Sequence, residues 1–274
     1  MRTNPEEAIE VAAVQLSAQE DVSENLRILR SMVLQAARRG ARLIVLPENL
    51  AFMGPERKKR QLAAPLSPTN PVFDALGAVA KEAQRWVIAG GIPEKSDDPL
   101  RPYNTCAVFA PDGTLAATYR KIHLFDVDLP DGTRLMESEA CLAGSAPQCV
   151  DIDGIRVGLS ICYDLRFPEL YRRLVSMGAQ LVVVPAAFTL TTGKDHWHVL
   201  LRARAIENQV YVVAAAQFGA HGARTTYGKA LIVDPWGTIV AQCSDHVGFC
   251  QHPIDLHYLR QVRRSLPCLQ HRRL

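Results

Sequence analysis

The stretch DVSENLRILRSMVLQAARRGARLIVLPE, residues 21–48, decides the fold class. Its first part is typical of an amphipathic helix over residues 21–39, because leucines and a valine recur near helical spacing and Gly40 is a typical helix stop. Leu43–Leu46 is short and wholly apolar, which indicates a central strand buried on both faces. A helix that leads into a buried strand predicts a layered α/β fold.

Strands and helices mix along the rest of the chain. The apolar runs predict strands at residues 11–16, 87–92, 103–110, 114–121, 181–184, 210–215, 230–233 and 238–242, and a strand pair around Asp153-Gly154 that leads into residues 155–161. Amphipathic stretches predict helices at residues 70–85, 168–177, 195–208 and 256–264. This mixture predicts a mixed sheet, and the pattern leaves open whether the second half builds a second sheet.

The composition narrows the class of protein. Of 274 residues, 48% are hydrophobic and 22% are charged, which is ordinary for a globular chain and excludes collagen-like, coiled-coil and disordered classes. The net charge of +3 is too small for a nucleic-acid-binding footprint. No apolar run approaches the ~20 residues of a membrane span, and the start of the chain lacks the apolar region of a signal peptide. We therefore expect neither a nucleic-acid nor a membrane partner.

Cysteine usage indicates the compartment. The seven cysteines are odd in number and form no CxxC pair, which argues against a disulfide framework or a structural zinc site. We expect a reducing, cytoplasmic setting in which most of these thiols pack as small apolar residues.

Three polar residues at the ends of predicted strands are candidates for catalysis. Glu48 ends one apolar strand, and Cys162 follows another on a strand-to-helix turn, which we expect to expose its sulfur and favour its thiolate. Lys121 ends a predicted hairpin strand and has apolar neighbours. A lysine beside a cysteine lowers the pKa of the thiol and can stabilise an oxyanion, and a glutamate can act as general base.

Each of the three also has an ordinary structural explanation. Glu48 alone could cap backbone N–H groups, Lys121 alone could be solvated, and Cys162 alone could be a core thiol. Spacing in one sequence does not show that they meet.

Three segments carry a family resemblance. LPE at Glu48, YRKIHLFD around Lys121 and SICYDLRFPEL around Cys162 resemble the signature segments of the nitrilase superfamily of carbon–nitrogen hydrolases. The resemblance runs from AVQL at residue 13 to the tail. The segments HLFDVDLPDGTRLMESE and PAAFTLTTGKDHWHVLLRARAIENQVYVVAAAQ are most similar to the branch whose members are deaminated glutathione amidases.

The resemblance implies a fold and a reaction. It implies a four-layer α-β-β-α sandwich in one domain over residues 1–274, with residues 1–9 and 260–274 peripheral, and a homodimer or larger homo-oligomer. Cys162 would attack a small-molecule amide to form a thioester, with Glu48 as base, while Lys121 and the backbone N–H of Tyr163 hold the oxyanion. No metal or organic cofactor is implied. The products would be 2-oxoglutarate and Cys-Gly, a metabolite-repair activity.

A second glutamate is also implied. Glu137 matches a further glutamate of the family's site that would position Lys121 or orient the substrate. Glu139 competes for this assignment, and a surface carboxylate is the ordinary alternative.

Four residues are implied to bind substrate. Besides Tyr163, Arg166 matches an arginine that would clamp a substrate carboxylate, and Phe188 and Thr189 would line the pocket. The alternative for Arg166 is an ion pair with a carboxylate of its own turn, Asp164 or Glu169. Asp164 is expected to brace the turn, and Tyr103 and Asn104 are weaker candidates.

Other functions stay open on the sequence alone. An ω-amidase acting on 2-oxoglutaramate would use the same triad in a smaller pocket, and nitrile hydrolysis is a more distant possibility. A non-catalytic binding protein on this fold and a Cys–His hydrolase that pairs Cys162 with His123 complete the alternatives.

Overall fold

The computed structural model describes residues 8–128 and 134–273. The strands are β1 (Ala8–Leu16), β2 (Leu43–Leu46), β3 (Trp86–Glu94), β4 (Tyr103–Phe109), β5 (Leu115–Arg120), β6 (Asp126–Asp128), β7 (Arg134–Met136), β8 (Cys149–Ile152), β9 (Ile155–Leu159), β10 (Leu181–Val183), β11 (Tyr211–Ala214), β12 (Ala216–His221), β13 (Arg224–Tyr227), β14 (Leu231–Val233), β15 (Ile239–Gln242) and β16 (Gly248–Asp255). The helices are α1 (Val22–Arg38), α2 (Glu56–Gln61), α3 (Pro71–Ala83), α4 (Pro168–Ser176), α5 (Leu190–Asn208), α6 (Leu256–Ser265) and α7 (Cys268–His271), with the 3-10 turns η1 (Glu137–Glu139) and η2 (Cys162–Arg166).

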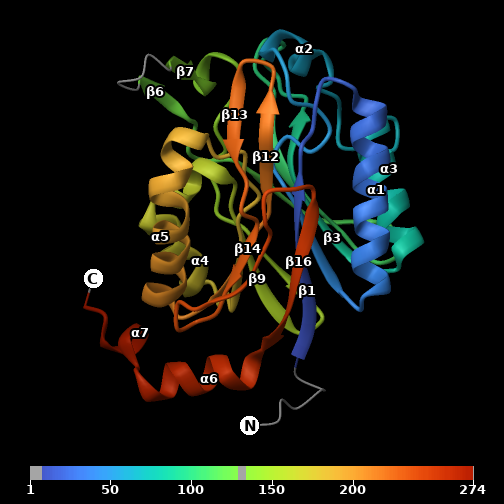
Figure 1. Ribbon diagram of the computed structural model, residues 1–274. Coiled ribbons are helices and arrows are strands. Elements are labelled where there is room, and N and C mark those ends of the chain that lie inside the picture. The colour runs from blue at the N-terminus through green and yellow to red at the C-terminus, as the bar shows by residue number, and fades with distance from the viewer. Residues whose placement is uncertain (1–7, 129–133, 274) are drawn as a thin grey trace.

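Two sheets stack face to face between two helix layers (Figure 1). The first sheet has the order β13-β12-β1-β2-β3-β4-β5, with β16 also paired to β1. The second has the order β15-β14-β11-β10-β9-β8. Helices α1 and α3 cover the first sheet, and α4 and α5 cover the second. The expected α-β-β-α sandwich is confirmed, and the question of a second sheet is answered.

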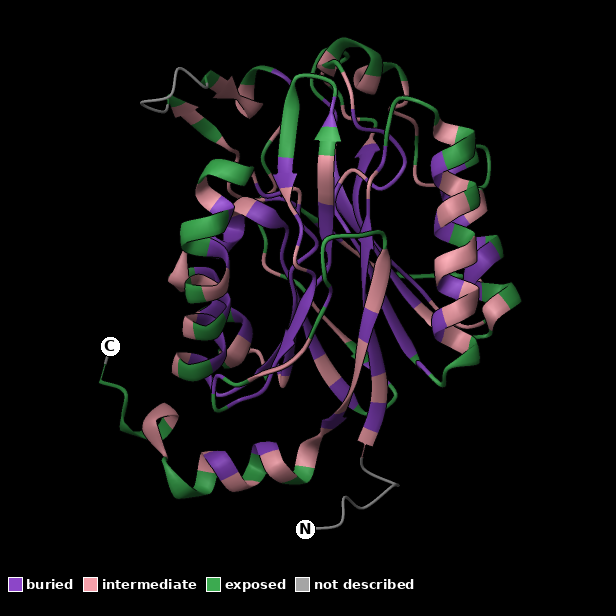
Figure 2. Ribbon diagram, in the orientation of Figure 1, coloured by how far each residue is buried: buried purple, intermediate pink, exposed green. Residues whose placement is uncertain are grey.

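Strand β2 shows why a wholly apolar run belongs in the middle. Because successive side chains alternate between faces, Leu43 and Val45 pack in the core between the sheets, whereas Ile44 and Leu46 pack in the core beneath α1 and α3. All four are fully buried. Figure 2 shows the same distribution, with buried residues concentrated in the strands and on the inner sides of the helices.

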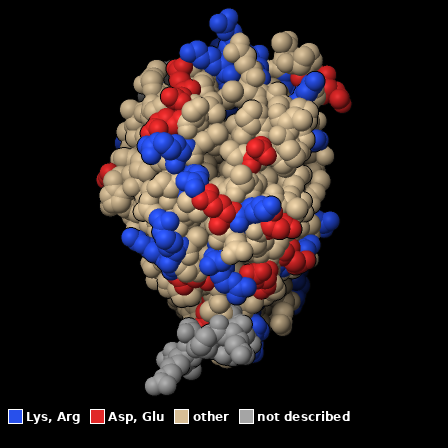
Figure 3. Space-filling model, turned by 90° about the vertical axis from the view of Figure 1, so that its right-hand side faces the viewer, with Lys and Arg blue, Asp and Glu red and all other residues tan. Residues whose placement is uncertain are grey.

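The outer face over α1 and α3 carries both signs of charge (Figure 3). Arg27 pairs with Glu24 on α1, and Arg30 of α1 pairs with Glu82 of α3. These exposed pairs contribute little stability, because water screens them. None of the helices within the described ranges is long and apolar enough to cross a membrane.

Helix α5 begins earlier than predicted. It starts at Leu190 and not at residue 195. The added first turn contains Gly193, where the helix packs closely against β13. A Cβ at this position would lie 2.4 Å from the Cβ of Tyr227 on β13, so only glycine lets the helix approach that strand.

The sequence did not predict five of the strands: β6, β7, β12, β13 and β16. Strand β16 pairs antiparallel with β1 from Ala8 to Gln15, and β12 and β13 form a hairpin that extends the first sheet. The C-terminal helix α6 then packs Leu259 and Val262 into the body of the molecule. Residues 1–7 of the N-terminal segment lie outside the described residues.

Candidate active site

Glu48 is buried at the carboxyl end of β2. It is 4% exposed, and its Oε2 accepts a hydrogen bond from the backbone N–H of Ala187 at 3.0 Å. Gly91 on β3 makes room for it, because a Cβ there would lie 2.8 Å from the Glu48 Cγ. The side-chain amide of Gln217 donates to the backbone carbonyl of Glu48 at 3.0 Å. Ala187 therefore holds the carboxylate, and Gln217 holds the backbone that carries it.

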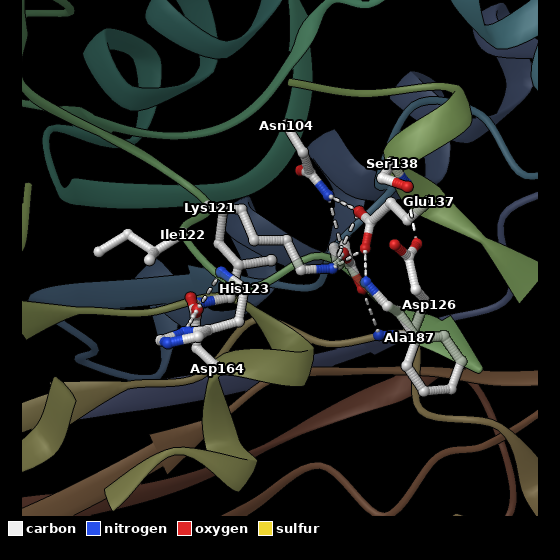
Figure 4. A network of polar contacts seen from close by, with 12 residues as sticks. Asn104, Lys121, Ile122, His123, Asp126, Glu137, Ser138, Asp164 and Ala187 are labelled. Carbon is white, nitrogen blue, oxygen red and sulfur yellow. Dashed lines mark hydrogen bonds and ion pairs between the residues drawn. The ribbon is translucent and has the colours of Figure 1, made fainter. Parts of the chain in front are cut away.

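Lys121 lies directly after β5 and is 2% exposed. Its Nζ donates to Glu48 Oε1 at 3.1 Å and to Glu137 at 3.0 Å (Oε1) and 2.7 Å (Oε2). Figure 4 shows its ammonium group among Asn104, Glu137 and Ala187. One cation is thus held between two carboxylates.

Opposing effects set the charges of this cluster. Burial alone lowers the pKa of the Lys121 ammonium, but Glu137 and Glu48 raise it, and the pKa lies well above its usual range. Burial alone raises the pKa of Glu137, but the bonds from Lys121 and the N–H of Phe125 leave it below its usual range. Lys121 and Glu137 are both charged at neutral pH.

Cys162 lies at the turn between β9 and α4. Its φ of 47° is left-handed, and its N–H donates to the Pro185 carbonyl at 2.9 Å. A non-glycine residue in this region is strained, and such strain clusters at functional sites.

The expectation that this turn exposes the sulfur and favours the thiolate is wrong for the described molecule. Cys162 is 9% exposed, and burial followed by the charge of Glu48 raises the pKa of its thiol well above the usual range. Lys121 lowers that pKa, as expected, but does not outweigh the other two effects. The sulfur therefore carries its proton at neutral pH.

Asp164 braces the Cys162 turn. Its Oδ2 accepts from the Tyr119 hydroxyl at 2.7 Å and the Ile161 N–H at 2.8 Å. Its Oδ1 accepts from the His123 N–H at 3.1 Å and lies 2.7 Å from His123 Nδ1. The His123 ring also stacks on Phe167, with centroids 3.7 Å apart. His123 is thereby engaged with the turn (Figure 4), which weakens the alternative that pairs it with Cys162.

A cavity of about 650 Å³ opens over this cluster. Glu48, Lys121, Glu137 and Cys162 line its floor, and residues of α2 and β13 line its rim. Glu139 also lines the cavity but is exposed, so of the two competing glutamates only Glu137 contacts Lys121.

A narrower recess adjoins the cavity at Cys162. All four expected substrate contacts line this recess: Tyr163, Arg166, Phe188 and Thr189. Phe125, Ala187 and Thr192 complete its lining. The Arg166 guanidinium lies 5.2 Å from the centre of the Phe188 ring, and its Nη1 lies 3.2 Å from His196 Nδ1. Within residues 8–128 and 134–273 no carboxylate approaches it within ion-pair distance, so the alternative pairing with Asp164 or Glu169 is not formed.

Asn104, which the sequence predicts only as a weaker candidate, belongs to the cluster. Its Nδ2 donates to Glu48 Oε1 at 2.9 Å and to Glu137 Oε1 at 3.2 Å, so it joins the same two carboxylates that Lys121 joins. The pairing of β4 with β5 is the feature that could have identified Asn104, because the Lys121 N–H donates to the Asn104 carbonyl across this hairpin.

Comparisons with known proteins agree with this geometry. Residues 10–264 match the family model described as carbon-nitrogen hydrolase. A protein of Synechocystis named deaminated glutathione amidase is 45% identical over 265 residues, which cover 95% of this chain and 97% of that protein. The crystal structure of the Caenorhabditis elegans NitFhit protein superimposes with a TM-score of 0.91 at 41% identity, over 100% of this chain and 66% of that one. A Saccharomyces cerevisiae structure, described as a member of branch 10 of the nitrilase superfamily, gives a TM-score of 0.85 at 31% identity, over 95% of each chain.

Proposed function

The chain belongs to the carbon–nitrogen hydrolase family, and from that premise we propose that it cleaves the amide of deaminated glutathione, giving 2-oxoglutarate and Cys-Gly. That it is an amide-hydrolysing enzyme follows from the family and from its relatives. The observation that carries the proposal is the cluster of Glu48, Lys121 and Cys162 on the floor of one cavity. The choice of substrate is supported by the relatives named for that activity.

In the first half of the proposed reaction, Cys162 attacks the amide carbon while Glu48 takes the thiol proton. The carbonyl oxygen gains negative charge, and the Lys121 ammonium and the backbone N–H of Tyr163 stabilise it. The C–N bond then breaks, and the leaving amine takes the proton from Glu48. A thioester on Cys162 remains.

In the second half, Glu48 removes a proton from water, and the resulting hydroxide attacks the thioester carbon. The C–S bond breaks, the acid leaves, and the sulfur regains its proton from Glu48. Glu137 holds Lys121 in place throughout, through the 2.7 Å contact. The reaction needs no metal or organic cofactor.

Arg166 is proposed to bind the carboxylate of the 2-oxo acid. Its guanidinium lines the narrow recess beside Cys162 and has no carboxylate partner within the described part of the chain. A planar guanidinium suits the two oxygens of a carboxylate.

A substrate panel tests the function. The purified enzyme is given deaminated glutathione, 2-oxoglutaramate, succinamate and an aliphatic nitrile, with Cys162→Ala as control. We expect the highest kcat/KM with deaminated glutathione and no turnover by the variant. A higher kcat/KM with 2-oxoglutaramate would make the enzyme an ω-amidase, and no hydrolysis at all would favour a binding protein.

We also propose that the enzyme assembles as a homodimer or larger homo-oligomer through the outer face of α5. Val199 and Ile206 on this helix are 66% and 46% exposed, and Trp236 in the β14–β15 turn is 58% exposed. Light scattering of the wild type and of Val199→Glu tests this, since a charge in the interface is expected to give a smaller species. A cytoplasmic location stays a prediction from cysteine usage.

A further inference from the structure

Lys59 is a cation of the cavity without a partner. It lies on α2, is partly buried, and lines the cavity that contains Glu48 and Cys162. Within the described ranges it forms neither an ion pair nor a hydrogen bond with another side chain. Its neighbour Lys58 differs, because it points to solvent and pairs with Glu20 at 2.6 Å.

The carboxylates around Lys59 are already paired, whereas Arg60 and Arg134 also line the cavity without a carboxylate partner among the described residues, and Nη1 of Arg60 donates to the Leu100 carbonyl at 3.3 Å. Lys121 is held by Glu48 and Glu137, and the Arg224 Nη1 of β13 lies 3.1 Å from Oε1 of Glu56. Lys59 therefore stands among carboxylates that already have cations of their own.

The Lys59 ammonium stays charged in this position. Burial lowers its pKa, but Glu56, Cys141, Glu137 and Glu48 raise it, and the pKa lies above its usual range. Burial raises the pKa of the nearby Cys141 thiol to about 11, so that thiol is neutral at neutral pH and does not neutralise Lys59. Lys59 thus presents a positive charge to the cavity, and that charge can form a charge-assisted hydrogen bond with an anionic ligand.

Cys162 lines both hollows of the site. Arg166 lines the narrow recess, and Lys59 lines the wide cavity. A substrate with one carboxylate on each side of its scissile amide would match these two cations. The leaving dipeptide spans at most about 7 Å, so it fits a cavity of about 650 Å³.

We propose that Lys59 binds the terminal carboxylate of the leaving peptide amine, and so selects a peptide amide over a simple primary amide with the same acyl group. The inference rests on the proposed function, because it takes the substrate as a 2-oxo acid joined to a short peptide. Lys59 acts in formation of the thioester only. Hydrolysis of the thioester is the same step for both kinds of substrate, because the leaving group has already gone.

The test uses three substrates that share one acyl group: deaminated glutathione, the same compound ending in glycinamide, and 2-oxoglutaramate. They are given to the wild type, Lys59→Met, Lys59→Arg and the control Lys58→Met, which makes the same change on the solvent side of α2. We expect Lys59→Met to lower kcat/KM about 10–100-fold for deaminated glutathione, the range of a charge-assisted hydrogen bond. The other two substrates, and Lys58→Met throughout, are expected to stay within about twofold of wild type. Lys59→Arg is expected to recover part of the loss.

The outcomes separate this inference from the proposed function. An equal loss on all three substrates would overturn the inference, and so would a wild type that hydrolyses the glycinamide compound as fast as deaminated glutathione. A wild type that acts on 2-oxoglutaramate but not on deaminated glutathione would instead overturn the proposed substrate. Circular dichroism of each variant controls for folding, and the glycinamide comparison needs no variant.

Discussion

Replacing Lys121 by methionine removes the one cation that two carboxylates share. In the wild type, Nζ lies 3.1 Å from Glu48 and 2.7 Å from Glu137, and the three side chains are 2%, 5% and 16% exposed. Methionine fills a similar volume without a charge. The variant therefore keeps two buried carboxylates with Asn104 as their common donor.

The cost follows from that burial. Removing one partner of a buried ion pair costs about 3–5 kcal/mol, because the other charge stays behind without compensation. At roughly 2–4 °C per kcal/mol, the melting temperature is expected to fall by roughly 6–20 °C at pH 8. Turnover is expected to be lost as well, because the oxyanion loses a cation.

The pH dependence gives the sharper result. The pKa of Glu137 is lowered in the folded wild type, so its contribution to stability is present above its unfolded pKa and is lost as the pH falls through its folded pKa. Without Lys121, burial is no longer opposed by the nearby ammonium, so the pKa of Glu137 rises, and protonation of Glu137 in acid removes part of the cost. Differential scanning fluorimetry between pH 8 and pH 5 is expected to show a gap between wild type and variant that narrows toward acid.

A partner variant makes this test specific. Lys121→Met combined with Glu137→Gln removes one of the stranded charges and is expected to recover about half of the lost stability at pH 8. A Lys121→Met protein as stable as wild type at pH 8, or a gap that widens on acidification, would refute the reasoning.

Three further predictions concern the nucleophile and its turn. Glu48→Gln is expected to abolish turnover yet speed the alkylation of Cys162 by iodoacetamide at pH 7, because after burial Glu48 is the main cause of the raised thiol pKa; slower alkylation would contradict this. His123→Ala is expected to keep most of the wild-type kcat, since its ring pairs with Asp164, whereas a loss equal to that of Glu48→Gln would favour a Cys–His hydrolase. Asp164→Asn is expected to lower the free energy of unfolding by about 2–4 kcal/mol in urea titrations, because this carboxylate accepts hydrogen bonds from Tyr119, His123 and Ile161, and an unchanged midpoint would exclude its bracing role.

Most of the individual strands and helices were predictable because local pattern decides them, whereas the four layers were predicted only from the family resemblance. Leu43–Leu46 is apolar throughout and is buried on both faces, as its composition indicates. Strand β16 was not predictable in this way. Its sequence GFCQHPID alternates poorly and contains Pro253, and it becomes a strand because it finds β1 more than 230 residues away in the sequence. Pairing over such distances depends on the assembled sheet, and a single sequence holds no local record of it.

Asn104 shows a different limit, which lies in the register. Counting back from the β4–β5 turn, Phe109 pairs with Leu115, and that register places Tyr103 opposite Lys121. A bulge between Val108 and Phe109 shifts the pairing by one residue, so that Asn104 lies opposite Lys121 instead. A shift of one residue exchanges the two faces of a strand, so the sequence did not predict that Asn104 contacts both glutamates.

The charges of the cluster explain why the Cys162 thiol keeps its proton without substrate and can still act as a nucleophile when an amide is bound. Lys121, Glu48 and Glu137 together carry one net negative charge when both glutamates are ionised, and a thiolate at the buried Cys162 would add a second. The proton therefore stays on the sulfur, as the raised pKa indicates. When an amide carbonyl occupies the site, the charge that leaves the sulfur moves onto the carbonyl oxygen beside Lys121, while the proton passes to Glu48. In the proposed reaction the nucleophile is thus activated only when a substrate is present to receive the charge.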